Sequence, residues 1–434
     1  MKLSVLGTGY LGATHAAAMA ALGHDVLGLD IDPAKVASLQ DGRVPFHEPG
    51  LPELLQEMLA TGRLRFTTDY AEVGAFADVH FLCVGTPQKK GEYAADLRFV
   101  DAAVSSLTPH LRSGSVVVGK STVPVGTAER LAKQLEQAEC DLAWNPEFLR
   151  EGHAVDDTLR PDRLVMGVEA EHVEKTLLEV YAAIVDTGVP VVVTDFATAE
   201  LVKVAANAFL ATKISFINAM AEICEVVGAD VTQLADAIGH DARIGRKFLD
   251  AGLGFGGGCL PKDIRAFMAR AGELGIDQAL AFLKQIDDIN VRRRARTVDL
   301  ARDVCGGSLA GMRVAVLGAA FKPNSDDIRD SPALDVALAT QRAGAAVRVY
   351  DPEAMDNARR DFPTLAYATS AVDAARDADV VLHLTEWEEF TSMHPSELSA
   401  VVRQRHIVDG RNKLDRVLWT REGWTHRTLG RRSI

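Results

Sequence analysis

The chain has 434 residues, 47% of them hydrophobic and 25% charged, which is typical of a globular protein with two or three domains. A formal net charge of -13 argues against nucleic acid or an anionic membrane as a partner. The five cysteines show no Cys-x-x-Cys pair and the twelve histidines no metal-ligand spacing, so we expect neither a disulfide framework nor a metal site. The sequence shows no export or membrane signal, and we therefore predict a cytoplasmic protein.

The chain opens with a nucleotide-binding pattern. Residues 2–7 read as a buried strand, GTGYLG follows from Gly7 to Gly12, and an alanine-rich helix is expected over 13–22. The next strand ends on Asp30, where a Rossmann unit places the carboxylate that binds the adenosine ribose. Because no arginine directly follows Asp30 and its charge would repel a 2′-phosphate, the pattern predicts NAD rather than NADP.

Two later strands, over 77–84 and 115–119, end in small polar turns that contain Thr86 and Thr122. The carboxyl ends of strands in an open parallel sheet face the ligand crevice, which would place both hydroxyls there. An ordinary helix N-cap is an equally good interpretation of either threonine.

Further polar side chains lie at a strand end and on a long helix. Glu147 follows the strand-like residues 141–144 and is a candidate general acid or base, or else part of an exposed turn. Lys203 and Asn207 are four residues apart on a predicted helix and share a face. They are candidates for holding an oxyanion, although two solvated side chains would give the same spacing.

The densest signal is GFGGGCLPKD, from Gly254 to Asp263. So many glycines favour unusual backbone angles or close approach of a ligand. Pro261 suits the first turn of a helix, so Cys259 would stand at the helix N-terminus, where a thiolate is favoured. These residues leave a nucleophile and a buried structural cysteine both open. Asp263, four residues on, would raise the pKa of the thiol and suits positioning of water better than activation.

The last third of the chain repeats the strand order of the first. Strands over 312–318, 347–352, 378–382 and 406–411 echo those of the N-terminal part, but the first turn lacks GxGxxG. Long, largely buried helices are expected over 199–226 and 277–304. We predict an α/β fold with two Rossmann-like doubly wound parallel sheets joined by a central helical region. The predicted domains are 1–196 for NAD, 197–303 for dimerisation and the catalytic cysteine, and 304–434 for the sugar nucleotide.

Eight motifs, in order along essentially the whole chain, resemble the UDP-glucose/GDP-mannose dehydrogenase family of nucleotide-sugar dehydrogenases. They are GTGYLG from Gly7, CVGTP from Cys83, STVPVGT from Ser121, NPEFLREG from Asn145, the helix with Lys203 and Asn207, GFGGGCLPKD from Gly254, FKPNSDDIRDSP from Phe321, and DGRN from Asp409. The resemblance implies NAD-dependent, four-electron oxidation of a primary alcohol to a carboxylate. Cys259 would carry the thiohemiacetal and the thioester, which agrees with the need to hold the intermediate aldehyde.

The resemblance also implies roles for individual residues. Lys203 and Asn207 would stabilise oxyanions, and Thr122, Glu147 and Asp263 would organise the water that relays protons. Arg243 would reach into the partner's site of a homodimer. The residues expected at NAD are Gly7, Gly9, Tyr10, Leu11, Gly12, Asp30, Lys35, Thr86 and Thr122. Those expected at the sugar nucleotide are Glu147, Phe148, Leu149, Glu151, Lys203, Asn207, Arg243, Phe255, Gly256, Lys322 and Arg411.

Two positions depart from the commonest pattern of the family. Gly258 stands where serine is frequent and Leu260 where phenylalanine is frequent, and leucine also occurs in the branch that oxidises GDP-mannose. We expect UDP-glucose as the substrate, with GDP-mannose and a UDP-N-acetylhexosamine as alternatives. A one-step hydroxyacid dehydrogenase and a catalytically silent sensor of NAD or nucleotide sugars are the competing classes.

Overall fold

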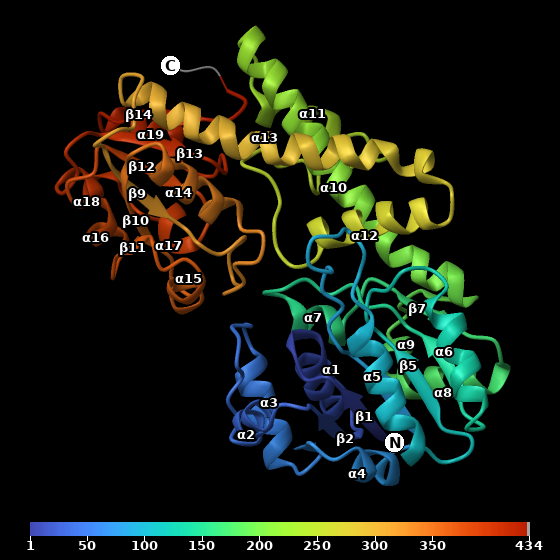
Figure 1. Ribbon diagram of the computed structural model, residues 1–434. Coiled ribbons are helices and arrows are strands. Elements are labelled where there is room, and N and C mark those ends of the chain that lie inside the picture. Colours follow the sequence, from blue (N-terminus) through green and yellow to red (C-terminus); the bar gives the residue numbers. More distant parts are fainter. Residues whose placement is uncertain (432–434) are drawn as a thin grey trace. The chain divides into compact units, whose positions relative to one another are not determined.

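The computed structural model describes residues 1–431 and forms two compact units (Figure 1). One unit contains residues 1–206 and 265–276, and the other contains residues 207–264 and the chain from 277 onward. Each unit holds one sheet. The predicted α/β fold with two doubly wound sheets and long central helices is thus confirmed, whereas the bounds of the three predicted domains stay a prediction.

The first sheet has eight strands in the order β3-β2-β1-β4-β5-β6-β7-β8. All neighbouring pairs are parallel except β6 and β7, which pair antiparallel through Trp144 and Gly167. The strands are β1 (Lys2–Leu6), β2 (Asp25–Leu29), β3 (Leu64–Thr67), β4 (Val79–Leu82), β5 (Val116–Gly119), β6 (Asp141–Trp144), β7 (Leu164–Gly167) and β8 (Val191–Thr194). The order of the first six is that of a dinucleotide-binding sheet, with the reversal of strand order between β1 and β4.

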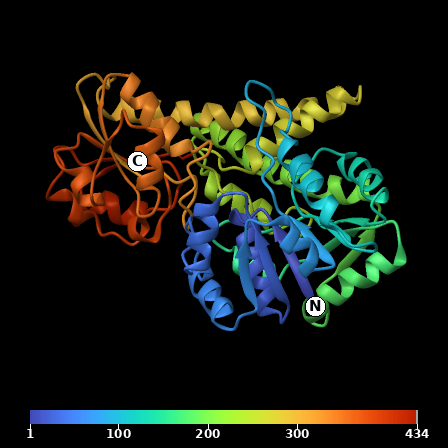
Figure 2. The same ribbon diagram turned by 60° about the horizontal axis from the view of Figure 1, so that its bottom comes forward.

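Helices cover both faces of this sheet, as the blue-to-green part of Figure 2 shows. They are α1 (Tyr10–Ala21), α2 (Pro33–Gln40), α3 (Leu51–Ala60), α4 (Tyr70–Phe76), α5 (Arg98–Leu107), α6 (Thr127–Glu136), α7 (Ala154–Leu159), α8 (Glu171–Val180) and α9 (Ala182–Val185). One core packs α1, α3 and α8 on the sheet, and a second core packs α4, α5 and α6 on its other face. Helix α2 begins where the sequence dictates, because the Asp32 side chain accepts from Ala34 N–H and Pro33 fills the first position.

Long helices follow the first sheet. They are α10 (Phe196–Val227), α11 (Val231–Gly239), α12 (Leu260–Glu273) and α13 (Ala281–Val304). By length and composition α10 is apolar enough to cross a membrane, but 44% of its most apolar stretch is buried inside the protein. Ser215 in its middle donates to the carbonyl of Ile286 on α13 (2.8 Å). We therefore interpret α10 as a core helix.

The second sheet has six parallel strands in the order β11-β10-β9-β12-β13-β14, which repeats the order of the first six strands of the other sheet. The strands are β9 (Arg313–Leu317), β10 (Ala346–Tyr350), β11 (Ala366–Tyr367), β12 (Val380–His383), β13 (His406–Asp409) and β14 (Thr425–Thr428). The helices are α14 (Pro332–Arg342), α15 (Met355–Asp361), α16 (Ala371–Ala375), α17 (Glu388–Thr391), α18 (Pro395–Ser399) and α19 (Arg416–Arg421). The internal repeat predicted from the sequence is therefore present at the level of topology.

Candidate active site

The glycine turn after β1 brings helix α1 very close to the strand. A Cβ on Gly12 would overlap the carbonyl oxygen of Gly7, so no side chain fits there. Gly7 has a φ of +85°, a conformation that favours glycine. Gly9 has open space where its side chain would be. A tight turn that leaves a helix N-terminus accessible is what a pyrophosphate requires, so the turn fits a dinucleotide.

Asp30 stands just beyond the carboxyl end of β2, beside this turn. Its Oδ2 accepts from Thr8 N–H (2.9 Å) and from the Lys35 ammonium (2.9 Å), and its Oδ1 accepts from Asp32 N–H (3.2 Å). Burial alone would raise the pKa of Asp30, but the bonds from Lys35, Asp32 and Thr8 lower it below its ordinary value. The carboxylate is therefore charged, and Oδ1 has capacity for a ribose hydroxyl.

The hydroxyl of Tyr10, the first residue of α1, joins two distant segments of the chain. The hydroxyl donates to the Glu48 carboxylate and accepts from Gly152 N–H (2.8 Å). Glu48 is buried and also accepts from the N–H groups of Gly152 (2.6 Å) and Ala154 (2.7 Å). The glycine turn and the NPEFLREG segment are thereby tied to each other. Cofactor contacts by Tyr10 and Leu11 stay a prediction.

The turns after β4 and β5 are joined through hydroxyl groups. Thr86 Oγ1 donates to the carbonyl oxygen of Thr122 (2.7 Å), and Ser121 Oγ donates to the carbonyl oxygen of Val84 (2.6 Å). Both predicted threonines thus lie together at the carboxyl edge of the sheet, and neither is the N-cap of a helix.

The turn that contains Thr122 is also held from its far end. Glu200 of α10 is buried, and its carboxylate accepts from Gly126 N–H and Ala128 N–H (2.7 Å each). These two groups belong to the first turn of α6, whose orphan N–H donors need partners. Glu200 therefore caps α6 and fixes where the turn ends.

Glu147 and Lys203 form a buried ion pair. The Lys203 ammonium lies 3.1 Å from Glu147 Oε1, and the two side chains are 7% and 13% exposed. Glu147 Oε2 accepts from Leu149 N–H (2.7 Å), which fixes the turn. The ring of Phe148 lies 5.6 Å from the ammonium and 3.8 Å from the guanidinium of Arg163. An acid and a cation predicted separately from the sequence are therefore in contact.

The glycine-rich stretch before α12 is held by side chains of its own unit. Asn290 of α13 accepts from Phe255 N–H (2.7 Å) and donates to Phe255 O (2.9 Å), and Arg294 donates to the same carbonyl (3.1 Å). A Cβ on Gly256 would overlap the carbonyl oxygen of Asp330. The glycines therefore permit close approach of backbone segments, as the sequence indicates.

Cys259 stands at the N-terminus of α12, immediately before Leu260, and its carbonyl accepts from Asp263 N–H (2.9 Å) as the first bond of that helix. Asp263 is buried, and its carboxylate accepts from Asn207 Nδ2 (2.6 Å) and from the ammonium of Lys262 (2.6 Å). The predicted positioning acid is thus held between an amide and a cation, one helical turn after the thiol.

The five cysteines differ sharply in environment, and none forms a disulfide. Cys259 is exposed, whereas burial raises the pKa of Cys83 to about 12 and that of the half-buried Cys305 to about 11. Burial also raises the pKa of the Cys140 and Cys224 thiols. Cys259 is therefore the accessible thiol, which favours the nucleophile over the buried structural cysteine.

Arg411 joins three backbone segments. Its guanidinium donates to the carbonyls of Leu384 (2.7 Å), Gly254 (3.1 Å) and Phe321 (3.0 Å). The glycine-rich stretch is thereby tied to two turns of the second sheet. Contact of Arg411 with a sugar nucleotide stays a prediction.

The remaining predicted residues have contacts of different kinds. Arg243 is exposed and pairs with Asp241. Glu151 is buried, and the Lys322 ammonium lies 5.4 Å from the ring of Phe321. Contacts of these side chains with a substrate, and the reach of Arg243 into a partner subunit, stay predictions.

Comparison with known families matches all three parts of the chain. The NAD binding domain of the UDP-glucose/GDP-mannose dehydrogenase family matches residues 1–185. The central domain of that family matches residues 197–292, and its UDP binding domain matches residues 315–416. The chain belongs to the UDP-glucose/GDP-mannose dehydrogenase family. NAD is thus the cofactor of its N-terminal part, in agreement with Asp30 and the glycine turn.

Relatives of this family match over nearly the full length. A UDP-glucose 6-dehydrogenase of Haloferax volcanii is 45% identical, covering 99% of this chain and 100% of that protein. The structure of a UDP-glucose dehydrogenase from Pyrobaculum islandicum has a TM-score of 0.88 at 39% identity, covering 95% of this chain and 94% of that one. That of a UDP-D-ManNAc dehydrogenase from Pyrococcus horikoshii has a TM-score of 0.87 at 27% identity and covers 99% of both chains.

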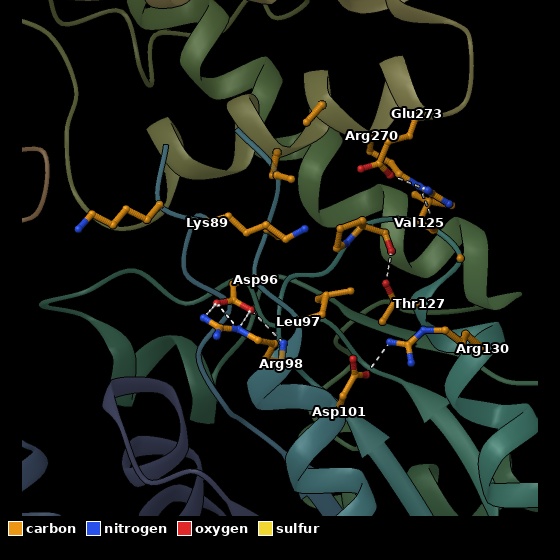
Figure 3. A pocket seen from close by; sticks show the side chains of 17 residues that line it. Lys89, Asp96, Leu97, Arg98, Asp101, Val125, Thr127, Arg130, Arg270 and Glu273 are labelled. Carbon is orange, nitrogen blue, oxygen red and sulfur yellow. Dashed lines mark hydrogen bonds and ion pairs between the residues drawn. The ribbon is translucent and has the colours of Figure 1, made fainter. Parts of the chain in front are cut away.

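A pocket of about 620 Å³ lies beside the α6 end of the Thr122 turn in this family member (Figure 3). Arginines line it, but each is paired with an acid: Arg98 with Asp96, Arg130 with Asp101, and Arg270 with Glu273. Arg270 also donates from Nε to the carbonyl oxygen of Val125 (2.9 Å). Arg270 thereby ties α12 to the turn after Thr122. Among the described residues, no three His, Cys, Asp or Glu side chains gather as metal ligands.

Sequence reasoning missed three buried polar residues that hold the site: Glu48, Lys120 and Glu200. The side chain of each forms hydrogen bonds with residues at least 25 positions away in the chain. Lys120 directly precedes the STVPVGT motif and Glu200 stands one turn before Lys203, so position beside a motif was the available signal. Nothing in the local pattern around Glu48 distinguishes it from a surface acid.

Proposed function

We propose that this protein oxidises UDP-glucose to UDP-glucuronate with two molecules of NAD. The observation that carries the proposal is the accessible Cys259 at a helix N-terminus, with Asp263 held by Asn207 and Lys262 one turn further. The preference for UDP-glucose rests on the full-length identity to UDP-glucose dehydrogenases, which is higher than that to the UDP-D-ManNAc dehydrogenase. The TM-scores do not distinguish the two.

In the first oxidation the sugar alcohol becomes an aldehyde. NAD supplies the hydride acceptor for this step and for the second one. The alcohol proton passes to a water molecule that Thr122, Glu147 and Asp263 organise. Lys203 and Asn207, one turn apart on α10, donate to the oxygen as it gains negative charge.

In the second oxidation the aldehyde stays attached to the enzyme. The Cys259 thiolate adds to the carbonyl carbon and gives a thiohemiacetal, whose loss of hydride gives a thioester. Water then attacks the thioester and releases the carboxylate and the thiol. In total one alcohol, two NAD and one water give one carboxylate, two NADH and three protons.

The sugar nucleotide would be held by residues that supply apolar, amide and cationic groups. We propose that these are Glu147, Phe148, Leu149, Glu151, Lys203, Asn207, Phe255, Gly256, Lys322 and Arg411, with Arg243 contributed to the partner subunit. Five cysteines without a disulfide support the expectation of a cytoplasmic location.

A panel of nucleotide sugars with NADH counting tests the proposal. We expect two NADH per UDP-glucose consumed. Turnover only with GDP-mannose or a UDP-N-acetylhexosamine would replace the substrate and keep the mechanism, and one NADH per substrate would indicate a one-step hydroxyacid dehydrogenase. No turnover with any of them, together with binding of NAD, would favour the sensor.

The Cys259→Ser and Cys259→Ala variants test the covalent route separately. Each should bind UDP-glucose with a Kd close to that of the wild type and lose complete oxidation. A Cys259→Ala variant that still forms two NADH per sugar would exclude the thioester. Cys305→Ser is the matched control, because this thiol is half-buried and its pKa is raised to about 11.

A further inference from the structure

Lys120 is a buried lysine at the carboxyl end of β5, only 7% exposed. Its ammonium donates to Asn145 Oδ1 (2.9 Å), Asn145 O (3.5 Å) and the hydroxyl of Tyr181 (3.2 Å). Tyr181 in turn donates to Asn145 Oδ1 (2.6 Å), and Asn145 Nδ2 donates to Val165 O (2.8 Å). The polar atoms of this network are thus satisfied by one another.

The ammonium has no carboxylate partner within ion-pair distance in the part of the chain that the structure describes. It lies instead 5.9 Å from the ring of Phe81 and 5.7 Å from that of Tyr181. Burial lowers the pKa of Lys120 to about 8, although the charge of Glu147 acts to raise it. A buried cation held by neutral groups is costly, and a methionine would fill the same space without that cost.

The hydrogen bonds of Lys120 connect two turns at the carboxyl edge of the first sheet. Lys120 directly precedes Ser121 and Thr122, and Asn145 is the first residue of the turn that carries Glu147. Both of the bonds to Asn145 therefore join the turn after β5 to the turn after β6. Glu147, two residues beyond Asn145, pairs with Lys203 at 3.1 Å.

We propose that Lys120 is a positioning residue for the reaction. With Tyr181 it fixes the Asn145 turn, so that Glu147 stays paired with Lys203. The positive charge of the Lys120 ammonium also acts on this ion pair. The proposal rests on the proposed role of Glu147 in organising water. Turnover should therefore fall when Lys120 loses its charge, by mutation or by deprotonation.

The titratable groups that face Lys120 are Cys83 after β4, Tyr181 after α8, His15 of α1, Glu147 after β6 and Lys203 of α10. Burial raises the pKa of Cys83 to about 12, raises that of Tyr181 and lowers that of His15. None of these three changes charge between pH 7 and 9. Glu147 and Lys203 are paired with each other.

The experiment compares the pH profile of kcat in wild type, Lys120→Met and Tyr181→Phe, with Lys133→Met, an exposed lysine on α6, as the control. Wild type should lose turnover above pH about 8. Lys120→Met should lower kcat about tenfold to a hundredfold, change KM less than about twofold, and lack that alkaline limb. A purely structural lysine would lower Tm and leave the limb in place, which would overturn the proposal.

Tyr181→Phe keeps the test valid if Lys120→Met does not fold. It removes one acceptor of the ammonium, so the alkaline limb should move to lower pH, and a limb that does not move would contradict the proposal. A readout without turnover is the fluorescence of Trp144, the buried residue before Asn145. Its emission should change near pH 8 in wild type and not in Lys120→Met, even if no nucleotide sugar is a substrate.

Discussion

The carboxylate of Glu200 accepts a hydrogen bond from the backbone N–H of Gly126, 2.7 Å away, and so joins α10 to the start of α6. The side chain is buried, and burial raises its pKa from 4.5 to about 7, against the lowering effect of its bonds to Ala128 and Gly126. The turn that carries Thr122 is thus capped by an acid that titrates near neutral pH.

Glu200 should make stability depend on pH in the direction opposite to that of an acid whose pKa is lowered by an ion pair. Between pH 4.5 and about 7 the folded state binds more protons than the unfolded state, so stability falls as pH rises through this window. The shift corresponds to about 3 kcal/mol at most. Urea unfolding of wild type and Glu200→Gln should show a difference that changes across this window and is constant above it. Glu129→Gln, exposed on α6, is the control, and an equal slope in all three proteins would exclude Glu200 as the source.

Lys203→Met should affect both stability and turnover. It leaves the largely buried carboxylate of Glu147 without its cation, which should lower the free energy of unfolding by about 3 kcal/mol. Turnover should fall about a hundredfold or more because an oxyanion donor is lost. The double variant Lys203→Met/Glu147→Gln should regain stability but not turnover. Lys175→Met, an exposed lysine, should change neither.

Arg411→Lys should lower stability and weaken substrate binding, although the lysine retains the positive charge. A single ammonium cannot span the carbonyls of Leu384, Gly254 and Phe321, which the guanidinium joins. We expect a loss of about 2 kcal/mol in unfolding free energy and a higher KM for the nucleotide sugar, because the Gly254 segment is released. Arg405→Lys, at an exposed position with one bond to Glu422 O, is the matched control. Wild-type stability and KM in Arg411→Lys would show that the three bonds contribute little.

Two neighbouring glycines before Cys259 should respond differently to substitution. A Cβ on Gly258 would meet the guanidinium of Arg329, the far end of a long, exposed side chain that pairs with Asp327, so Gly258→Ser should keep activity within about fivefold. Gly257 has a φ of +85° and faces the ring of Phe321, so Gly257→Ala should lower stability by about 2 kcal/mol or more. Comparing Tm and kcat of the two variants checks this order. The reverse order would place the backbone constraint at Gly258 instead.

An apolar stripe on α10 should hold a second copy of the chain. Phe209, Phe216 and Ile223 recur every seven residues and are 66%, 47% and 53% exposed. Phe216→Glu should therefore convert a dimer to a monomer at micromolar concentration in sedimentation velocity. Val417→Glu, at a site that is 77% exposed, should leave the assembly unchanged. A dimer that persists in Phe216→Glu would rule out this stripe as the interface.

Most of the fold was accessible from the sequence because its signals are local. The glycine turn and the strand that precedes Asp30 each follow from residues within a few positions of one another, and the repeated strand order follows from several such strands. The short strand β11, with two residues, and the antiparallel pairing of β6 with β7 have no such local signal. Their positions depend on packing between distant segments.

In the candidate site, too, local features could be predicted from the sequence and long-range contacts could not. Spacing alone places Lys203 and Asn207 on one face, and it places Cys259 at a helix start. The pairing of Lys203 with Glu147 joins residues 56 positions apart, and that of Asn207 with Asp263 also spans 56 positions. Such pairings required the structure, as did the use of Tyr10 and Arg411 to join segments of the protein.

Because one thiol is exposed and four are shielded, the native protein should react with thiol reagents at a single cysteine. At neutral pH a maleimide or an iodoacetamide should modify Cys259 before the others, since burial raises the pKa of each of the other four. Labelling would therefore count the molecules in a preparation that present an accessible Cys259 thiol. It would also attach a fluorophore or a surface at the thiol that we propose as the nucleophile, with no cysteine removed first.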